Sequence, residues 1–118
     1  MTGDEVRALC LALPETTEKE TWGDDENPGH PTFRVRDKIY VIMAVDGSGG
    51  SIRTSMAEQS DLTSAFPDAA RIAGYVGRFG WVDVDFAGIP DEVLREVIES
   101  AWARTAPKKL AAAWRDGR

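Results

Sequence analysis

The sequence predicts an α+β fold, a two-layer sandwich in which helices pack on one face of an antiparallel sheet. Two neighbouring segments carry this prediction. Residues 81–86 alternate polar and apolar side chains, which is typical of a strand with one buried face. Residues 91–104 follow Pro90 and repeat apolar side chains at helical spacing. The other segments extend the order to helix, three or four strands, helix, two strands, helix.

Length and composition indicate a single domain over residues 1–118. A chain of 118 residues with 42% hydrophobic side chains can form one modest core. Its apolar stretches are far shorter than the roughly 20 residues of a membrane span, and its acidic first residues do not resemble a signal peptide. The single cysteine, Cys10, excludes an internal disulfide. We therefore expect a soluble, cytoplasmic, monomeric protein that does not bind membranes.

The charge of the chain counts against tight binding to nucleic acid. The formal net charge is −6 and the isoelectric point is near 4.7, whereas domains that contact several phosphates are commonly basic. The negative charge is concentrated in residues 1–30, which hold eight acids and two bases. Residues 31–82 hold six bases and five acids. A locally basic surface in the middle of the chain is therefore compatible with the sequence.

The first helix is predicted over residues 3–13. Thr2 and Glu5 have the spacing of a capping box, and Pro14 marks the end of the helix. Cys10 falls on the apolar side of this helix. Since the chain has one histidine, we interpret Cys10 as a small buried side chain rather than a catalytic thiol.

Residues 15–31 are acidic and contain one short predicted strand. This strand lies around residues 19–22 with Trp22 facing inward, and residues 23–31 form a loop in which His30 is an ordinary loop residue. The acidic side chains are Glu15, Glu18, Glu20, Asp24, Asp25 and Glu26. Clustered carboxylates can hold a cation, but their spacing fits no calcium-loop pattern, and a lone histidine makes a poor metal site. We predict a solvated loop with no metal and no cofactor, and keep a role in metal delivery as an alternative.

A tight hairpin is predicted over residues 32–45. Apolar side chains alternate on both sides of residues 36–38, which form the turn. This pattern places Arg34 and Arg36 together on the outward face of the first strand. The glycine-rich turn at residues 46–50 lacks the Gly-Lys-Ser/Thr sequence of a phosphate-binding loop.

The second half of the chain alternates strands and helices. The predicted elements are a strand at 51–54, a helix from the capping box at 55–58 to about Phe66, a strand at 72–76, a turn at 77–80, and a short basic helix at 108–114 after the long helix. In the basic helix, Leu110 and Trp114 are four residues apart, and we expect them to dock on the body of the domain.

Several short motifs, taken in order, resemble the MmcQ/YjbR family. They are FRVRDKIY at 33–40, SIRTS at 51–55, GYVGRFGWV at 74–82, IPDEVL at 89–94 and ESAW at 99–102. The similarity extends over roughly residues 3–113, and the order and spacing of the motifs are more specific than any one of them. The sequence departs from the family pattern at Arg53, where lysine is usual, and at Ser55-Met56, where Asp-Pro is usual.

The resemblance implies a secretion-chaperone-like or frataxin-like sandwich, in agreement with the predicted order of elements. It also implies DNA binding through paired β-hairpin wings, an analogy at the level of the fold. Arginine suits phosphate because its planar guanidinium donates two hydrogen bonds, and aromatic side chains can stack on bases. The candidate DNA-binding residues are Arg34, Arg36, Lys38, Arg53, Arg71 and Arg78, with Tyr40, Tyr75, Phe79 and Trp81 as candidate base contacts.

Two alternatives remain. In the first, the arginines are solubilising residues paired with Asp37, Asp83 or Asp85, while the aromatic side chains pack internally. In the second, the domain is an adaptor that binds a protein or a small ligand beside Trp81 and Tyr75, because these residue types often anchor interfaces. Catalysis is not predicted, since the sequence contains no arrangement typical of nucleophilic or metal-dependent hydrolysis.

Overall fold

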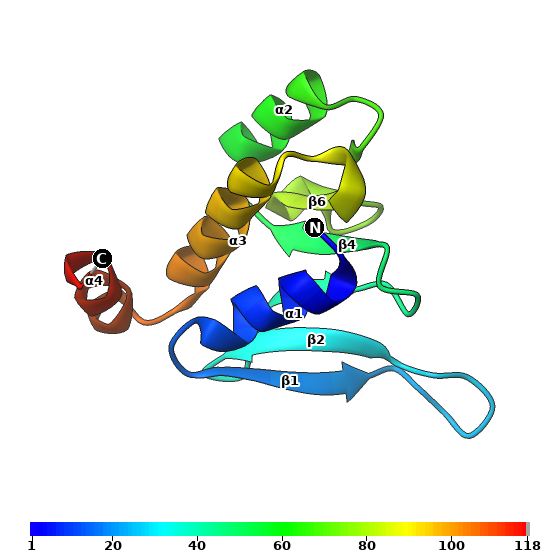
Figure 1. The fold of residues 1–118 in the computed structure, drawn as a ribbon, viewed down its shortest axis with the longest axis horizontal. Helices are drawn as coiled ribbons and strands as arrows, with labels where there is room; N and C mark the ends of the chain where they lie inside the picture. Colours follow the sequence, from blue (N-terminus) through cyan, green and yellow to red (C-terminus); the bar gives the residue numbers. More distant parts are fainter. Residues whose placement is uncertain (118) are drawn as a thin grey trace.

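The computed structural model describes residues 1–117, and its centre is a six-stranded antiparallel sheet with the strand order β1-β2-β3-β4-β6-β5 (Figure 1). The strands are β1 Thr16–Thr21, β2 His30–Val35, β3 Lys38–Met43, β4 Gly49–Arg53, β5 Ala70–Ile72 and β6 Trp81–Asp85. The helices are α1 Gly3–Ala12, α2 Met56–Ala65, α3 Asp91–Thr105 and α4 Lys108–Asp116, with short 3-10 turns η1 Gly77–Phe79 and η2 Phe86–Gly88. This confirms the predicted α+β order, with the basic helix α4 at its end.

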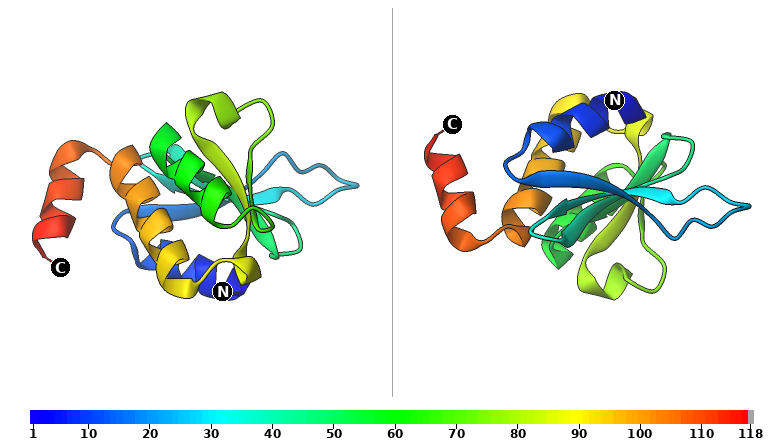
Figure 2. Two further views of the ribbon diagram at one scale, coloured as in Figure 1. Left: turned by 90° about the horizontal axis from the view of Figure 1, so that it is seen from above. Right: turned by 90° about the horizontal axis from the view of Figure 1, so that it is seen from below.

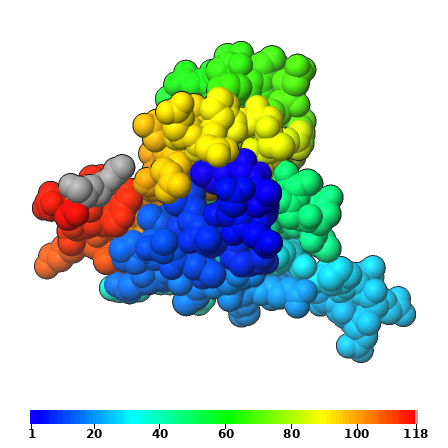
Figure 3. All heavy atoms as spheres, in the orientation of Figure 1, coloured from blue at the N-terminus to red at the C-terminus, as the bar shows by residue number. Residues whose placement is uncertain are grey.

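The helices and the sheet form two layers. α1 packs on β1, α3 packs on β3 and β4, and α2 packs on β5. Figure 3 shows α1 and α3 lying against each other on this side of the molecule, and Figure 2 shows the segment around η1 on the opposite side of the sheet. We call the sheet face opposite α1 and α3 the open face. Within residues 1–117, the helices are too short or too polar for any of them to cross a membrane.

The core lies between the helices and the covered face of the sheet. Residues opposed on neighbouring strands point to the same face, and the row Val41, Ile52 and Val82 across β3, β4 and β6 is fully buried. From the other layer, Leu94 and Ile98 of α3 are also fully buried. The alternation predicted for the last strand and the apolar stripe predicted for the long helix are therefore both confirmed.

Two predictions for the N-terminal segment were wrong. Trp22 does not face inward: it follows β1 in a left-handed backbone conformation with φ 66°, and its side chain is 63% exposed. His30 is not a loop residue, because it begins β2 opposite Thr21. The indole ring of Trp22 and the imidazole ring of His30 lie edge to face with their centroids 6.5 Å apart.

The strand expected at residues 72–76 is displaced toward the N-terminus, and runs over Ala70–Ile72.

The β2–β3 hairpin differs from the prediction at two points. Its turn has two central residues, Arg36 and Asp37, with φ of 49° and 68°, as hairpin turns of type I′ require. Further along, Phe33 is opposite Val41 and Arg34 is opposite Ile39, so that β3 has one extra residue between these pairs. This β-bulge changes which side chains of β3 point toward the core.

Cys10 is expected to be unreactive toward thiol reagents in the folded protein. Its side chain is fully buried, and burial raises the pKa of the thiol to about 12. Since the thiolate is the reactive form, labelling with a chromogenic disulfide near neutral pH should be slow until denaturant is added. Fast stoichiometric labelling under native conditions would show that α1 opens readily.

Candidate nucleic-acid interface

The open face carries a row of mostly polar residues that crosses the whole sheet. In strand order the row is Lys19, Thr32, Ile42, Ser51, Asp83 and Arg71. Because opposed residues share a face, all six side chains project away from the side that α1 and α3 cover. Arg53 and Trp81 form a further opposed pair on β4 and β6, on the same face of the sheet. The open face therefore combines cations, hydroxyls and one large aromatic ring.

The open face is basic although the chain as a whole is acidic. Its cations are Lys19, Arg34, Arg53, Arg71 and Arg78 of η1. Its acids are Asp83, Asp85 and Asp37 of the hairpin turn, whose Oδ1 lies 3.7 Å from Nη1 of Arg34. Five cations and three carboxylates give this face a formal charge of +2, whereas the whole chain has −6 and the rest of it therefore −8. Such a separation of charge attracts anionic ligands to the open face and away from the helices.

The turn formed by residues 75–79, which we call the η1 turn because it ends in η1, presents two exposed aromatic rings beside the open face. Tyr75 is 85% exposed and Phe79 is 59% exposed. The Arg78 guanidinium lies over both, 5.4 Å from the Tyr75 ring centroid and 4.8 Å from that of Phe79. Tyr75 has φ 56°, a strained conformation for a bulky residue. The Gln59 side chain anchors the turn by donating hydrogen bonds to backbone carbonyls of η1 and β6 at 2.7 and 2.8 Å.

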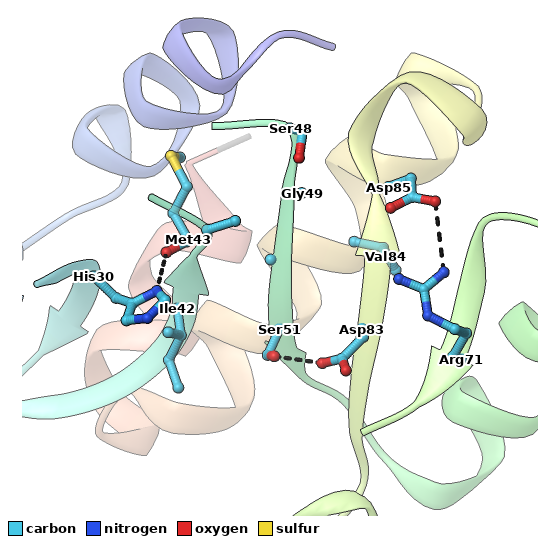
Figure 4. A pocket seen from close by; sticks show the side chains of 12 residues that line it. His30, Ile42, Met43, Ser48, Gly49, Ser51, Arg71, Asp83, Val84 and Asp85 are labelled. Carbon is cyan, nitrogen blue, oxygen red and sulfur yellow. Dashed lines mark hydrogen bonds and ion pairs between the residues drawn. The ribbon is translucent and has the colours of Figure 1, made fainter. Parts of the chain in front are cut away.

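A pocket of about 310 Å³ lies at the middle of the open face (Figure 4). On the β2–β3 side it is lined by Ile42 and by His30, whose ring Nδ1 lies 3.2 Å from the backbone oxygen of Met43. On the opposite side, Arg71 donates a hydrogen bond to the Asp85 carboxylate at 3.5 Å. The pocket is thus walled by an imidazole and an aliphatic chain on one side and by an ion pair on the other.

The floor of the pocket is formed by β4, where the side chains are small. Gly49 and Gly50 line it with their backbone, followed by Ser51. The Ser51 hydroxyl donates a short hydrogen bond to Oδ1 of Asp83, which fixes the orientation of this carboxylate. Within residues 1–117, Oδ2 of Asp83 accepts no hydrogen bond. Oδ2 and the second lone pair of Oδ1 are therefore available to a ligand.

Six of the residues predicted from the sequence lie on the open face or in the η1 turn beside it. They are Arg53, Arg71, Arg78, Tyr75, Phe79 and Trp81. Arg34 is also on this face, opposite Ile39, but its guanidinium donates hydrogen bonds to the hydroxyls of Thr32 and Thr21, each at 3.2 Å, and its side chain is only 14% exposed. Lys38 is exposed at the start of β3, beside the hairpin turn.

The sequence pattern predicted that Arg36 and Arg34 share the outward face of β2, but in the structure they do not. It lies in the hairpin turn, and its guanidinium donates hydrogen bonds to both carboxylate oxygens of Glu15, with 3.1 Å from Nη2 to Oε2. The Arg36 hydrogen bond lowers the pKa of Glu15, and the same bond raises the pKa of Arg36. Arg36 therefore ties the β2–β3 turn to the end of α1, and its donors toward Glu15 are occupied.

Tyr40 is not a base contact, because it is buried in the core. The β-bulge in β3 turns its ring toward α1, where the hydroxyl lies 2.8 Å from the Thr16 hydroxyl and donates to the Cys10 carbonyl at 3.4 Å. The side chain is 0% exposed, and burial raises the pKa of its phenol. Its place among the candidate ligand contacts is therefore withdrawn.

Sequence reasoning missed the pocket. Its signals were weak: Asp83 was predicted on an outward strand face and Ser51 in another strand, but nothing in the sequence indicated that β4 pairs with β6 and brings them together. The acidic loop at 22–29 has a simpler account than cation binding. Asp24 Oδ1 accepts backbone hydrogen bonds from Glu26 and Asn27, which lower the pKa of Asp24 and hold the loop. Across residues 1–117, no three potential metal ligands converge.

Comparison with known proteins identifies relatives by sequence pattern and by fold. The model of the YjbR family matches residues 11–104, which contain the whole sheet and leave out α4. The crystal structure of Deinococcus radiodurans protein DR2400, described by the family-model domain DUF419, is similar with a TM-score of 0.74 and 21% identity, over 87% of this chain and 77% of that chain. At this identity the likeness establishes the fold alone. Among curated proteins, none shows a significant match.

Proposed function

The chain belongs to the YjbR family, and from this premise we propose that it binds single-stranded DNA on the open face. The observation that carries the proposal is the charge of this face, +2 in a chain of −6, together with the exposed rings beside it. Arg53 and Arg78 form no ion pair within residues 1–117, so their guanidinium groups are available to phosphates. Bases can stack on Tyr75, Phe79 and Trp81, as in other strand-binding sheets.

The shape of the molecule favours a single strand over a duplex bound by hairpin wings. The longest projecting loop, between β1 and β2, carries Asp24, Asp25 and Glu26 (Figure 1), which repel phosphate. The β2–β3 turn has its arginine bound to Glu15. Exposed aromatic rings gain most from unpaired bases, since bases in a duplex are already stacked.

The proposal is tested by fluorescence anisotropy with a labelled oligothymidine of about nine nucleotides, a length within the site sizes of single-strand binders. The same label on a duplex of equal length is the comparison. We expect tighter binding of the single strand, and weaker binding at about 200 mM salt than at about 50 mM, because phosphate contacts release counterions. Absence of binding to either probe at the lower salt concentration would contradict the proposal.

Removing the ring of Tyr75 is expected to weaken oligonucleotide binding by about 1–3 kcal/mol, the usual contribution of stacking by one base on an aromatic side chain. Tyr75→Ala should leave the melting temperature unchanged within error, since the ring is 85% exposed. Tyr75→Phe is the matched control, because it keeps the ring and should bind like the wild type. Equal affinity of the alanine variant would remove Tyr75 from the site.

A second candidate function is a protein-binding adaptor. Ile72, whose side chain lies next to Gly77 of η1, is 62% exposed, and Tyr75 and Phe79 are exposed as well. Exposed apolar side chains near one another are typical of protein contacts. If the domain is an adaptor, we expect that it does not bind the oligonucleotide probes. We also expect a defined protein to co-purify with the wild type and not with Ile72→Ser. The two candidates are therefore separated by the anisotropy titration.

A further inference from the structure

We propose that the pocket on the open face receives a guanine base of the bound strand, with the Asp83 carboxylate accepting its N–H donors. This inference rests on the proposed function, and it adds a base preference to a face that otherwise contacts phosphates and stacks rings. The inference is based on three features that lie together at the middle of this basic surface: the pocket, the oriented carboxylate of Asp83 and the guanidinium of Arg71.

Two carboxylates at the middle of the open face are what a phosphate-binding surface should lack. Asp83 and Asp85 lie between Arg53 and Arg71, on the adjoining strands β4, β6 and β5, where they repel a phosphate backbone. A carboxylate is instead an acceptor for the N–H groups of bases. Their presence at the pocket indicates that a base edge, rather than a phosphate, occupies this part of the face.

Among the DNA bases, guanine fits a carboxylate and an arginine best. Its ring N1–H and exocyclic N2–H₂ are adjacent donors on one edge, which the two oxygens of one carboxylate can accept together. Adenine, cytosine and thymine each place an acceptor next to their donor on that edge, and this acceptor would face the carboxylate. Guanine also carries the O6 and N7 acceptors that arginine recognises, and Arg71 lines the same pocket.

The pocket is large enough for a base, and the Asp83 carboxylate that lines it is held in one orientation. Its volume of about 310 Å³ lies at the lower end of the range of about 300–1,000 Å³ found for small-ligand sites. The floor is open because Gly49 has no side chain, and a Cβ there would lie 2.3 Å from the backbone oxygen of Val84. The Ser51 hydroxyl occupies one lone pair of Oδ1 of Asp83, which leaves Oδ2 and the other lone pair of Oδ1 for the two guanine donors.

The test uses oligothymidine of about nine nucleotides with one central nucleotide changed to dG, to deoxyinosine, to dA or to dC. In the wild type we expect dG to bind about tenfold more tightly than the all-thymidine probe, the effect of one bidentate base contact. Deoxyinosine, which lacks the N2 amino group, should lie between them. Asp83→Asn should bring the dG probe to the affinity of the all-thymidine probe, because an amide presents a donor to guanine.

Two variants distinguish recognition of the base from a change in the charge of the protein. Asp83→Asn removes a negative charge from the open face, so its affinity for plain oligothymidine should stay the same or rise. Asp61→Asn on α2, which removes an exposed carboxylate that does not line the pocket, should leave the dG preference intact. Equal affinities of all wild-type probes, or a dG preference that survives Asp83→Asn, would overturn the inference while leaving strand binding in place. Failure of every probe to bind would overturn the proposed function as well.

Discussion

Replacing Arg53 and Arg78 together by alanine is expected to weaken single-stranded DNA binding by about a hundredfold. A hydrogen bond to a charged group contributes about 1.5–3 kcal/mol, which is about tenfold or more in affinity for each arginine. Neither guanidinium forms an ion pair within residues 1–117, so the substitutions break no salt bridge in the described fold. The slope of log affinity against log salt should also fall by roughly 1.4, at about 0.7 for each phosphate contact to a single strand. Both quantities come from anisotropy titrations at several salt concentrations.

The matched control removes the same charge from the helical side. Arg95 of α3 and Arg115 of α4 are exposed, and their double alanine variant changes the net charge of the chain by the same amount. We expect this control to bind nearly as the wild type does. An equal loss in both double variants would mean that general attraction, rather than the open face, accounts for binding.

Trp102→Ala is expected to lower the free energy of unfolding by about 3–5 kcal/mol, the usual cost of removing a large buried aromatic side chain. Trp102 is fully buried in α3, and its indole N–H donates to the Pro14 carbonyl at 3.0 Å. Its ring packs against that of Trp114, with the centroids 5.2 Å apart. The substitution therefore loosens the contact of α3 with both the end of α1 and α4. Urea unfolding followed by far-UV circular dichroism measures the effect.

Trp22→Ala is the control for this prediction. The Trp22 side chain is 63% exposed after β1, so its removal should cost less than about 1 kcal/mol, as most surface substitutions do. A comparable loss of stability in the two variants would show that the core does not centre on α3.

The fold was predictable where local patterns and tertiary packing agree. The alternation from Trp81 to Phe86 and the apolar stripe of α3 each specify a buried face, and the two faces meet in the core as expected. The capping boxes at Thr2 and Ser55 are both formed. These signals come from neighbouring residues in the chain, and no distant contact overrides them.

The errors in the hairpin have identifiable physical causes. Alternation along β3 predicts Ile39 and Val41 on one face, but the extra residue of the β-bulge puts Tyr40 and Val41 in the core and leaves Ile39 half-buried. Nothing in the sequence marks this bulge. Arg36 was expected in the turn and also on the outward face beside Arg34. Its positive φ, which is uncommon outside glycine and asparagine, turns the backbone away from that face.

The candidate site was predictable in part. Arg53, Arg71 and Trp81 were identified as residue types that suit a strand-binding surface, but the order of the strands brings them together, and β4 pairs with β6 across an intervening helix and β5. The same non-local pairing creates the pocket around Asp83. Residue type can therefore be judged from a single sequence, whereas the convergence of these side chains depends on contacts between distant segments.

The most direct test of the central claim is an NMR titration of the ¹⁵N-labelled whole chain with a single-stranded oligonucleotide of about nine nucleotides. The account predicts amide shift changes for Ser51, Arg53, Trp81, Asp83 and the η1 turn, with α1 and α4 unaffected. Shift changes confined to the helices or to the acidic β1–β2 loop, or none at low salt, would contradict it.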